Sequence, residues 1–378
     1  MNMRTARIGL LGLGTVGQAV AQLNRSADGI AFQIVRALVR DIKVPRSVTI
    51  PRTLDPAEII DDPEIDIVVE VTGRRHPARR WILSALEHGK AVITANKEVM
   101  AYHGPELLHA SQIHHAYLGF EASVGGGMPV LDALRYHLTN TPVHEIYGVL
   151  NGTTNYLLCA MAEGQPLFHA LHNAQQAGYA EADPTADLKG YDAARKLVIL
   201  AFLAFDGWLD PDHLTVTGLH DWPPELFFRL QDAGLGLRLL AVARKDHNGV
   251  VTAQVRPTVI PATSRLMQVM GAQNGIGIST DAGCFWIEGP GAGGMATATS
   301  IWSDIRRSQL FADGFFPHPA PHISAGEVSL PLLEIARDRD RSLTTGPQPS
   351  QRFADPSLRL VPPLSEPSDG TWTFPFWE

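Results

Sequence analysis

Cysteine is nearly absent from this chain of 378 residues, which contains only Cys159 and Cys284. Two cysteines exclude a disulfide framework and a cysteine-rich zinc module, and they are typical of a reducing compartment. Charged residues are also scarce, at 19%, and the 39 acidic side chains against 31 basic ones give a net charge of −8. Such a chain lacks the basic surface that nucleic-acid binding needs. We therefore expect a cytoplasmic protein with no nucleic-acid partner.

Long hydrophobic runs are missing as well. No apolar stretch approaches the ~20 residues that a helix needs to cross a bilayer, so we expect no membrane partner. Residues 8–21 imitate a signal peptide, but the glycines among them are poor helix formers and follow a spacing of their own. Hydrophobic residues still make up 45% of the chain, enough for a substantial core. Since one domain usually has ~100–200 residues, this length predicts two domains.

The first third of the chain alternates short apolar segments with helical ones. We expect strands at 6–11, 34–39, 65–71 and 91–94, and helices at 18–24, after Asp55-Pro56 and at 77–88. Strands and helices that alternate at this spacing form βαβ crossovers and a parallel sheet. The pattern predicts a doubly wound, Rossmann-type α/β domain over residues 1–138, and the glycine motif described below makes NAD(P) its expected ligand.

A different pattern begins near residue 140. We expect strands at 143–150, 238–243, 250–255, 276–280 and 284–288, and helices at 153–162, 166–177 and 190–205. Short strands separated by Asn-Gly or Asp-Ala-Gly turns favour antiparallel pairing. This predicts an α+β domain with a largely antiparallel sheet over residues 139–288; the family resemblance given below implies that this domain binds the substrate. The exposed face of that sheet is the reason to expect a homodimer.

The end of the chain is expected to add no further domain. Residues 289–310 contain a glycine loop and a helix near 300–308, and we expect them to return to the nucleotide-binding domain. Residues 311–378 are proline-rich, with one helical candidate at Leu330–Arg341. This tail lacks the pattern of a small regulatory domain, and we expect much of it to be loosely ordered.

Three glycines mark a candidate nucleotide site. Gly12, Gly14 and Gly17 follow a strand and open a helix, which is the context of the dinucleotide fingerprint. The first permits a tight turn, the second lets the backbone approach a pyrophosphate, and the third allows close packing of helix on strand. The N–H groups at the start of the helix can then bind the phosphates. The alternative is a tight turn with no ligand.

The end of the second strand bears on the choice of cofactor. Arg40 can pair with the 2′-phosphate of NADP, whereas Asp41 can bond the ribose hydroxyl of NAD. Both can also be solvated turn residues. We favour NADP, with NAD as the alternative.

Two other strand ends carry candidate ligands. Lys97 follows the strand at 91–94, where ligands bind in open α/β sheets, although it is equally well explained as a solvated amine. The glycine-rich turn at 121–129 leaves backbone carbonyls uncovered, which suits a hard cation. A flexible connection into the next helix explains this turn at least as well.

Four carboxylates and several basic residues crowd into residues 178–196, just before a very apolar helix. Asp192 and Lys196 are four residues apart and share one face of that helix. An exposed pair of this kind contributes only ~0.3–0.5 kcal/mol, too little to explain two charges on so hydrophobic a helix. A buried pair would face a cavity, where Lys196 is a candidate proton donor. An ordinary salt bridge is the alternative.

Taken together, these motifs resemble the homoserine dehydrogenase family over residues 6–308. The matching sequences are GLGTVG, ITANK, GFEASVGGGMP, NGTTNYLL, GYAEADPTADLKGYDAARK and GPGAGG. The resemblance implies an NAD(P)-dependent oxidoreductase that interconverts L-homoserine and L-aspartate 4-semialdehyde in threonine, methionine and isoleucine biosynthesis. The alternatives are another two-domain NAD(P)-dependent reductase of an amino acid semialdehyde or imine, and a non-catalytic protein that senses NADP(H).

The resemblance also implies roles for single positions. It makes Lys196 the proton donor and Lys97 a second essential amine. It gives Asp192 a role both in catalysis and in substrate binding. The implied cofactor residues are Gly12, Gly14, Thr15, Val16, Thr72, Lys97, Gly178 and Gly293. The implied substrate residues are Glu181, Asp187 and Asp192. A monovalent cation, Na+ or K+, maps to Glu121, Val124, Gly126 and Met128. The tail beyond residue 311 does not resemble the regulatory ACT domain of many family members.

Overall fold

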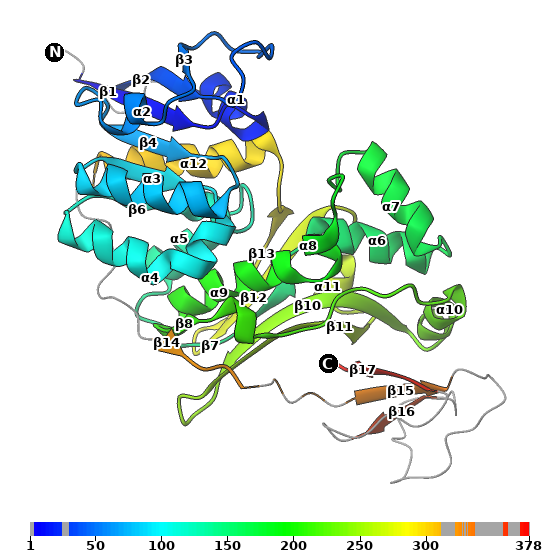
Figure 1. Ribbon diagram of the computed structural model, residues 1–378. Helices are drawn as coiled ribbons and strands as arrows, with labels where there is room; N and C mark the ends of the chain where they lie inside the picture. Colours follow the sequence, from blue (N-terminus) through cyan, green and yellow to red (C-terminus); the bar gives the residue numbers. More distant parts are fainter. Residues whose placement is uncertain are drawn as a thin grey trace. The chain divides into compact units, whose positions relative to one another are not determined.

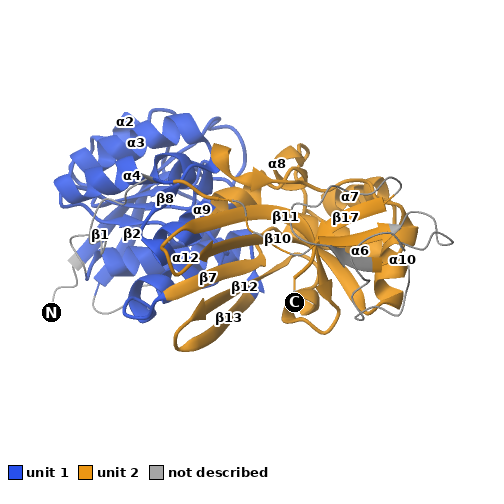
Figure 2. Ribbon diagram, turned by 90° about the horizontal axis from the view of Figure 1, so that it is seen from below, with its two compact units in different colours: residues 1–142, 198–211, 289–323 blue, residues 143–197, 212–288, 324–378 orange. Residues whose placement is uncertain are grey.

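The computed structural model describes residues 4–24, 30–310, 322–326, 328, 330, 332–336, 358–361 and 371–377. The chain forms two compact units, which Figure 2 shows in blue and orange. Unit 1 comprises residues 1–142, 198–211 and 289–323, and unit 2 comprises residues 143–197, 212–288 and 324–378. The units differ from the expected domain ranges at residues 139–142 and 198–211, which belong to unit 1. Among the described residues, no helix is both long and apolar enough to cross a membrane.

Unit 1 is built on a six-stranded parallel sheet with the strand order β3-β2-β1-β4-β5-β6 (Figure 1). Its strands are β1 (Arg4–Leu11), β2 (Ile30–Leu38), β3 (Arg52–Thr53), β4 (Ile67–Glu70), β5 (Ala91–Thr94) and β6 (Leu118–Gly119). The strand order reverses between β1 and β4, and in such sheets the ligand crevice lies outside the carboxyl ends of these strands. The predicted doubly wound α/β fold is confirmed.

Helices complete unit 1. They are α1 (Thr15–Gln22), α2 (Ala57–Ile60), α3 (Arg75–Glu87), α4 (Lys97–Ile113), η1 (Glu121–Ser123), α5 (Val130–Asp132), the π-helical η2 (Ala133–His137) and α12 (Gly294–Ser308). The short strands β8 (Trp208–Leu209) and β14 (His322–Ile323) pair in parallel. Residues 8–11 of β1 and 67–69 of β4 are buried apolar runs rather than alternating ones, as is typical of parallel strands covered on both faces.

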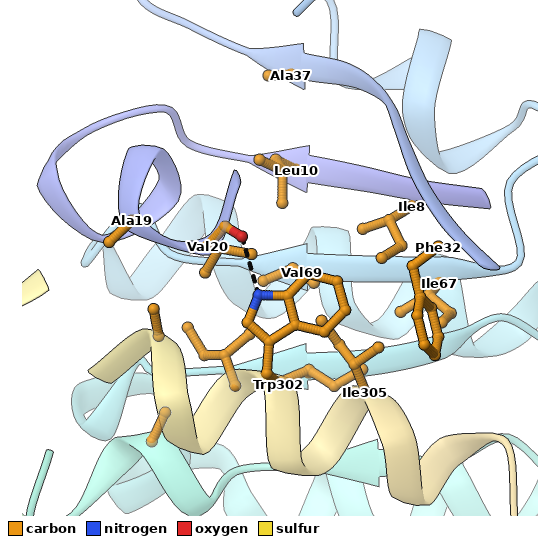
Figure 3. Packing of buried hydrophobic residues seen from close by; sticks show 14 of the residues in the cluster. Ile8, Leu10, Ala19, Val20, Phe32, Ala37, Ile67, Val69, Trp302 and Ile305 are labelled. Carbon is orange, nitrogen blue, oxygen red and sulfur yellow. Dashed lines mark hydrogen bonds between the residues drawn. The ribbon is translucent and has the colours of Figure 1, made fainter. Parts of the chain in front are cut away.

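The late helix α12 belongs to the core of unit 1. Figure 1 shows it in yellow among the blue elements, where it packs against α1. Its Trp302 and Ile305 lie in one apolar cluster with Ile8 of β1 and Ile67 of β4 (Figure 3). The indole Nε1 of Trp302 donates a hydrogen bond to the carbonyl oxygen of Val20 at 2.9 Å.

Unit 2 contains a second six-stranded sheet with the order β13-β12-β7-β10-β11-β9. Its strands are β7 (Val143–Val149), β9 (Thr215–Val216), β10 (Leu235–Lys245), β11 (Val251–Pro261), β12 (Gln273–Thr280) and β13 (Gly283–Pro290). The four strands β12, β7, β10 and β11 pair antiparallel, and β9 runs parallel to β11. The remaining elements are α6 (Gly152–Ala162), α7 (Leu167–Gln176), α8 (Thr185–Leu188), α9 (Tyr191–Phe205), η3 (Pro211–His213), α10 (Pro224–Asp232) and α11 (Arg265–Gln268). Of α9, residues 191–197 belong to unit 2 and residues 198–205 to unit 1. The predicted α+β architecture is confirmed.

The tail contains strands where a helix was expected. Strands β15 (Leu332–Ala336), β16 (Leu358–Val361) and β17 (Thr371–Pro375) form an antiparallel sheet with β15 in the centre. The prediction of a helix over Leu330–Arg341 is therefore wrong for residues 332–336, because hydrogen bonds to two distant segments replace those of a helix. Residues 337–341 lie outside the described part of the chain, as do most of the residues expected to be loosely ordered.

Candidate active site

The glycine loop joins the carboxyl end of β1 to α1. Gly12 has a φ of +114°, a conformation that glycine adopts readily. A Cβ atom on Gly17 would approach the carbonyl oxygen of Gly12 to 2.2 Å, so α1 packs directly on the loop. A Cβ atom on Gly14 would meet nothing within 4 Å, so the space beside Gly14 is open. This geometry fits the cradle that a pyrophosphate needs.

The starts of two helices lie together at this loop. Thr15 and Val16 form the first turn of α1, whose N-cap residue Gly14 offers no side chain to cap the N–H groups. Gly293 is the N-cap residue of α12, also with a φ of +114°. A Cβ atom on the next residue, Gly294, would lie 3.0 Å from Thr15 Cγ2, which places the start of α12 against α1. The cofactor candidates Thr15, Val16 and Gly293 are thus close together at this point.

Arg40 and Asp41 follow β2 in an exposed bend. The Oδ1 atom of Asp41 accepts a hydrogen bond from the backbone N–H of Lys43 at 2.8 Å, so this carboxylate is already engaged in a local turn. The Arg40 guanidinium makes no hydrogen bond or ion pair with any residue that the structure describes. Of the two side chains, Arg40 is the one available to a ligand.

A buried carboxylate organises the ends of β4 and β5. Glu70 is 0% exposed, and burial raises its pKa. It accepts hydrogen bonds from Thr72 Oγ1 at 2.6 Å and from Thr94 Oγ1 at 2.8 Å. Asn96 caps α4, so Lys97 is the first residue of that helix, with a half-buried side chain. The two cofactor candidates Thr72 and Lys97 therefore lie at neighbouring strand ends that Glu70 links.

The loop after β6 holds the candidate cation ligands. Glu121 is 1% exposed; its Oε1 accepts the N–H of Leu131 at 3.1 Å, and its Oε2 has no hydrogen-bond partner among the described residues. Burial, together with the nearby Asp132 and Asp304, raises the pKa of Glu121 well above its usual range.

Backbone atoms would have to supply most ligands of such a cation. Val124 and Met128 are buried, and the carbonyl oxygen of Gly126 accepts a hydrogen bond from Ser300 Oγ at 2.7 Å. Within the described ranges, no group of three His, Cys, Asp or Glu side chains is arranged to hold a metal ion. The Oε2 of Glu121 and the neighbouring glycine-rich backbone fit a monovalent cation, but the described residues supply only this one carboxylate ligand.

The charged pair of α9 is buried in unit 2. Asp192 is 6% exposed and Lys196 is 7% exposed, and the Lys196 Nζ lies 2.8 Å from the Asp192 Oδ2. The same ammonium donates to the carbonyl oxygen of Leu150 at 2.6 Å. No third partner of this ammonium occurs in the described part of the chain, so one of its three N–H groups has no acceptor there.

Asn274 supports the same carbonyl group. This asparagine on β12 is 0% exposed, and its Nδ2 donates to the Leu150 carbonyl oxygen at 2.9 Å. The register of β12 against β7, in which Gly275 lies opposite Val149, brings Asn274 beside Leu150. The acceptor of Lys196 is thus held by the sheet itself. Sequence reasoning missed Asn274, because nothing local connects it to residue 150.

Asn151 connects the charged pair to a second carboxylate. Its Nδ2 donates to Asp187 Oδ1 and to Asp192 Oδ2, both at 2.7 Å. Burial and the neighbouring Asp192 raise the pKa of Asp187. The structure therefore brings the candidates Asp187, Asp192 and Lys196 together around one amide. Asn151 was not among the predicted site residues, although an Asn directly before a helix is a capping signal.

The remaining candidates of unit 2 lie outside this group. Glu181 is exposed, and its side chain makes no hydrogen bond or ion pair with the described residues. Gly178 has a φ of +76° and follows the end of α7, the position where a glycine commonly terminates a helix. The other predicted cofactor residues belong to unit 1, whereas Gly178 belongs to unit 2.

Comparisons with known proteins identify similar sequences and structures. A family model described as "Homoserine dehydrogenase, NAD binding domain" matches residues 12–121, and one described as "Homoserine dehydrogenase" matches residues 129–305. The homoserine dehydrogenase of Bacillus subtilis (strain 168) is 37% identical over 315 residues, which cover 80% of this chain and 72% of that protein. The homoserine dehydrogenase of Mycobacterium leprae is 39% identical with the same coverage, 80% and 72%.

Solved structures give the same result. A homoserine dehydrogenase from Thiobacillus denitrificans superimposes with a TM-score of 0.82 at 34% identity, covering 90% of this chain and 84% of that one. A hyperthermophilic archaeal homoserine dehydrogenase in complex with NADPH superimposes with a TM-score of 0.67 at 25% identity, covering 81% of this chain and 98% of that one.

Proposed function

The chain belongs to the homoserine dehydrogenase family, and from that premise we propose that Lys196 is the proton donor of its reaction. The protein is an NAD(P)-dependent oxidoreductase that interconverts L-homoserine and L-aspartate 4-semialdehyde, a reaction of amino acid biosynthesis. The observation that carries the proposal is the bonding of the Lys196 ammonium. Asp192 and Leu150 hold it at 2.8 and 2.6 Å and leave one N–H group free among the described residues.

The chemistry of the reduction needs such a group. The bound nicotinamide supplies the hydride. Negative charge then develops on the aldehyde oxygen, where a fixed ammonium stabilises it and provides the proton. Asp192 fixes the direction of the Lys196 ammonium, while the Leu150 carbonyl restrains it from a second side. In the reverse direction the same amine receives the proton of the homoserine hydroxyl.

Carboxylates of the same segment are proposed to bind the amino acid. Asp187 and Asp192 together carry more negative charge than Lys196 balances, so an ammonium on the substrate is attracted to this group. Glu181 is the further carboxylate of the segment, exposed and available to the α-ammonium. Lys97 is proposed as a second essential amine on the side of the cofactor, since it begins α4 at a strand end of unit 1.

NADP is the proposed cofactor, with NAD as the alternative. Its pyrophosphate is assigned to the glycine loop, with Thr15, Val16 and Gly293 beside it. Arg40 supports the choice of NADP because its exposed guanidinium can bond a 2′-phosphate, whereas Asp41 is engaged with Lys43. The archaeal relative solved in complex with NADPH agrees with this assignment. Gly178 stays a proposed cofactor residue of unit 2.

A monovalent cation, Na+ or K+, is proposed at the loop after β6. The unpaired Oε2 of Glu121 supports a cation there, and backbone oxygens near Val124, Gly126 and Met128 are the other proposed ligands. Gel-filtered protein should show a higher thermal midpoint when Na+ or K+ is added in place of a bulky organic cation. An equal midpoint in all salts would contradict the site.

We also propose a cytoplasmic homodimer. Both cysteines are free thiols, as expected in a reducing compartment. The sheet face that was expected to be free is covered in part by the chain itself, because Val328, Leu330 and Trp377 pack against it. Strand β13 is at the edge of this sheet as described, and an edge strand is a template for pairing with a second copy. Light scattering after gel filtration tests the stoichiometry.

One assay tests the proposed reaction. The protein is mixed with L-aspartate 4-semialdehyde and NADPH, and the loss of NADPH absorbance is followed, with NADH in a parallel reaction. We expect turnover that needs both substrates and yields homoserine, identified by chromatography. Failure of wild-type protein to consume NADPH, although it binds the cofactor in a fluorescence titration, would overturn the proposed function.

A further inference from the structure

Asn151 lies at the junction of β7 and α6, directly after the Leu150 carbonyl that binds Lys196. We propose that Asn151 is a positioning residue for the proton donor, which acts by fixing Asp192 against Lys196 and by holding Asp187 beside them. The proposal rests on the proposed function, because it assigns Asn151 a role in the same reaction. The role is indirect, because Asn151 bonds the two carboxylates and not Lys196 itself.

The Asn151 side chain is only 4% exposed, and both its Oδ1 and its Nδ2 form hydrogen bonds within the protein. Its Oδ1 accepts the backbone N–H of Thr154 at 2.7 Å, which caps α6. Its Nδ2 donates to Asp187 Oδ1 and to Asp192 Oδ2, both at 2.7 Å. The orientation of the amide follows from these partners, since only nitrogen can donate to carboxylates and only oxygen can accept from an N–H group.

The position therefore combines two requirements. Ser, Asp and Asn are all good helix N-cap residues, because each provides an oxygen that accepts the N–H bond. Only Asn also supplies two N–H donors, and two donors are needed to hold two carboxylates side by side. An aspartate at this position would place a third negative charge against Asp187 and Asp192. The cap explains a small polar residue here, and the carboxylates explain why it is an asparagine.

The link to Lys196 passes through a single oxygen atom. Asp192 Oδ2 accepts from Asn151 Nδ2 at 2.7 Å and pairs with Lys196 Nζ at 2.8 Å. Two donors on one oxygen restrict the rotation of the carboxylate and so fix its direction toward the ammonium. The next residue back, Leu150, binds that ammonium directly. Residues 150 and 151 thus both restrain Lys196: Leu150 through its carbonyl oxygen, and Asn151 through the carboxylate of Asp192.

Two variants separate the cap from the positioning role. Asn151→Ser retains a capping oxygen but removes both N–H donors, leaving one hydroxyl on a shorter side chain that cannot hold two carboxylates. Asn151→Asp retains the cap while replacing the donors with a charge. We expect both to fold and to bind NADPH as wild type does; the thermal midpoint should stay close to that of wild type in Asn151→Ser and be lower in Asn151→Asp, because a third buried carboxylate is introduced. We expect kcat for aspartate 4-semialdehyde to fall about tenfold or more in Asn151→Ser and further in Asn151→Asp, because a misdirected donor weakens only the transition state.

The pH profile gives a readout that a purely structural role would not change. The hydrogen bond from Asn151 lowers the pKa of Asp187, so its removal should raise that pKa. Because the carboxylate must be ionised to attract a substrate ammonium, the acid limb of kcat/KM should move to higher pH in Asn151→Ser. Asn155→Ser is the matched control: Asn155 is a buried asparagine of the same helix, but it bonds to the carbonyl oxygens of Val269 and Gly271.

The outcomes separate clearly. A tenfold loss of kcat with an acid-limb shift in Asn151→Ser, absent from Asn155→Ser, supports the proposal. A kcat within about twofold of wild type and an unmoved pH profile would overturn it, as would equal effects in the Asn155 control. If Asn151→Ser does not fold, the near-isosteric Asn151→Asp decides by the same criteria. An inactive wild type would instead refute the proposed function and is seen before any variant is made.

Discussion

Lys196 and Asp192 lie one helical turn apart on α9, with the ammonium nitrogen 2.8 Å from the carboxylate oxygen and both side chains more than nine-tenths buried. Removing two charges from water is unfavourable unless each is well bonded. Here the ammonium has a second acceptor in Leu150 and the carboxylate has a second donor in Asn151. The pair is therefore stable in a position where solvent competes little with a substrate.

Replacement of Lys196 should remove catalysis and leave binding intact. Lys196→Ala should lower kcat by roughly 10²–10⁴, the usual contribution of a positioned general acid. Folding should persist because Asn151 still donates to Asp192. The measurement is steady-state kinetics together with an NADPH titration, and Lys189→Ala, in an exposed position of the same segment, is the control. A kcat within about threefold of wild type would exclude Lys196 as the donor.

Replacement of Glu181 should affect the substrate alone. Glu181→Gln keeps the shape of the side chain and removes its charge, so the KM for homoserine should rise severalfold while the affinity for NADPH stays the same. The exposed Asp183 offers a control, since its carboxylate already bonds the backbone N–H of Thr185. An equal KM in wild type and Glu181→Gln would mean that this carboxylate is only solvated.

Two glycines of the nucleotide loop should respond in opposite ways. Gly14→Ala adds a methyl group to open space and should leave the thermal midpoint unchanged, while it weakens NADPH binding by blocking the approach of the pyrophosphate. Gly17→Ala places a methyl group 2.2 Å from the Gly12 carbonyl oxygen and should destabilise the protein by ~1–3 kcal/mol. Thermal unfolding and cofactor titration of both variants test this contrast. Normal NADPH affinity in Gly14→Ala would show that the pyrophosphate does not bind at this loop.

Arg40 should determine the choice of cofactor. A charge-assisted contact with a 2′-phosphate contributes ~1.5–3 kcal/mol, or roughly 10- to 150-fold in affinity. Wild type should prefer NADPH to NADH by about that factor in kcat/KM, and Arg40→Ala should lose most of this preference by weakening NADPH. Asp41→Ala is the comparison, because Asp41 bonds Lys43. A wild type that prefers NADH, with NADH use impaired in Asp41→Ala, would contradict the assignment.

Asp304 should make stability depend on pH. It is 0% exposed, and burial raises its pKa to about 6. Between about pH 4 and pH 6 the unfolded chain releases this proton while the folded protein keeps it, so the free energy of unfolding falls as pH rises. Two pKa units correspond to about 3 kcal/mol. Denaturant unfolding at several pH values should show a smaller change in Asp304→Asn than in wild type, with the exposed Asp221→Asn behaving as wild type.

The sequence allowed the main elements of both units to be predicted, because their patterns are local. The glycine loop, the alternation of the first third and the i,i+4 pair on α9 each lie within a short stretch of chain. The tail could not be predicted in this way. Leu332–Ala336 is a short apolar run that suits a helix or a strand, and the partners that make it a strand begin at residues 358 and 371.

The residues that position the site were missed for the same reason. Asn151 bonds a carboxylate 41 positions away, Asn274 bonds a carbonyl 124 positions away, and Asp304 accepts from a residue 183 positions away. Each looks like an ordinary polar residue in its own stretch. Their roles depend on which segments the fold brings together, and a single sequence contains no local sign of that.

The contact of Trp302 with Val20 has a consequence for the order of events during synthesis. These residues are 282 positions apart, yet both belong to the core of unit 1. The nascent nucleotide-binding unit thus leaves the ribosome without its last core helix. At ~5–20 residues per second, synthesis of the stretch from residue 142 to the end of α12 takes roughly 10–30 s. During that interval the apolar residues around Ile8 and Ile67 lack the helix that covers them in the folded unit.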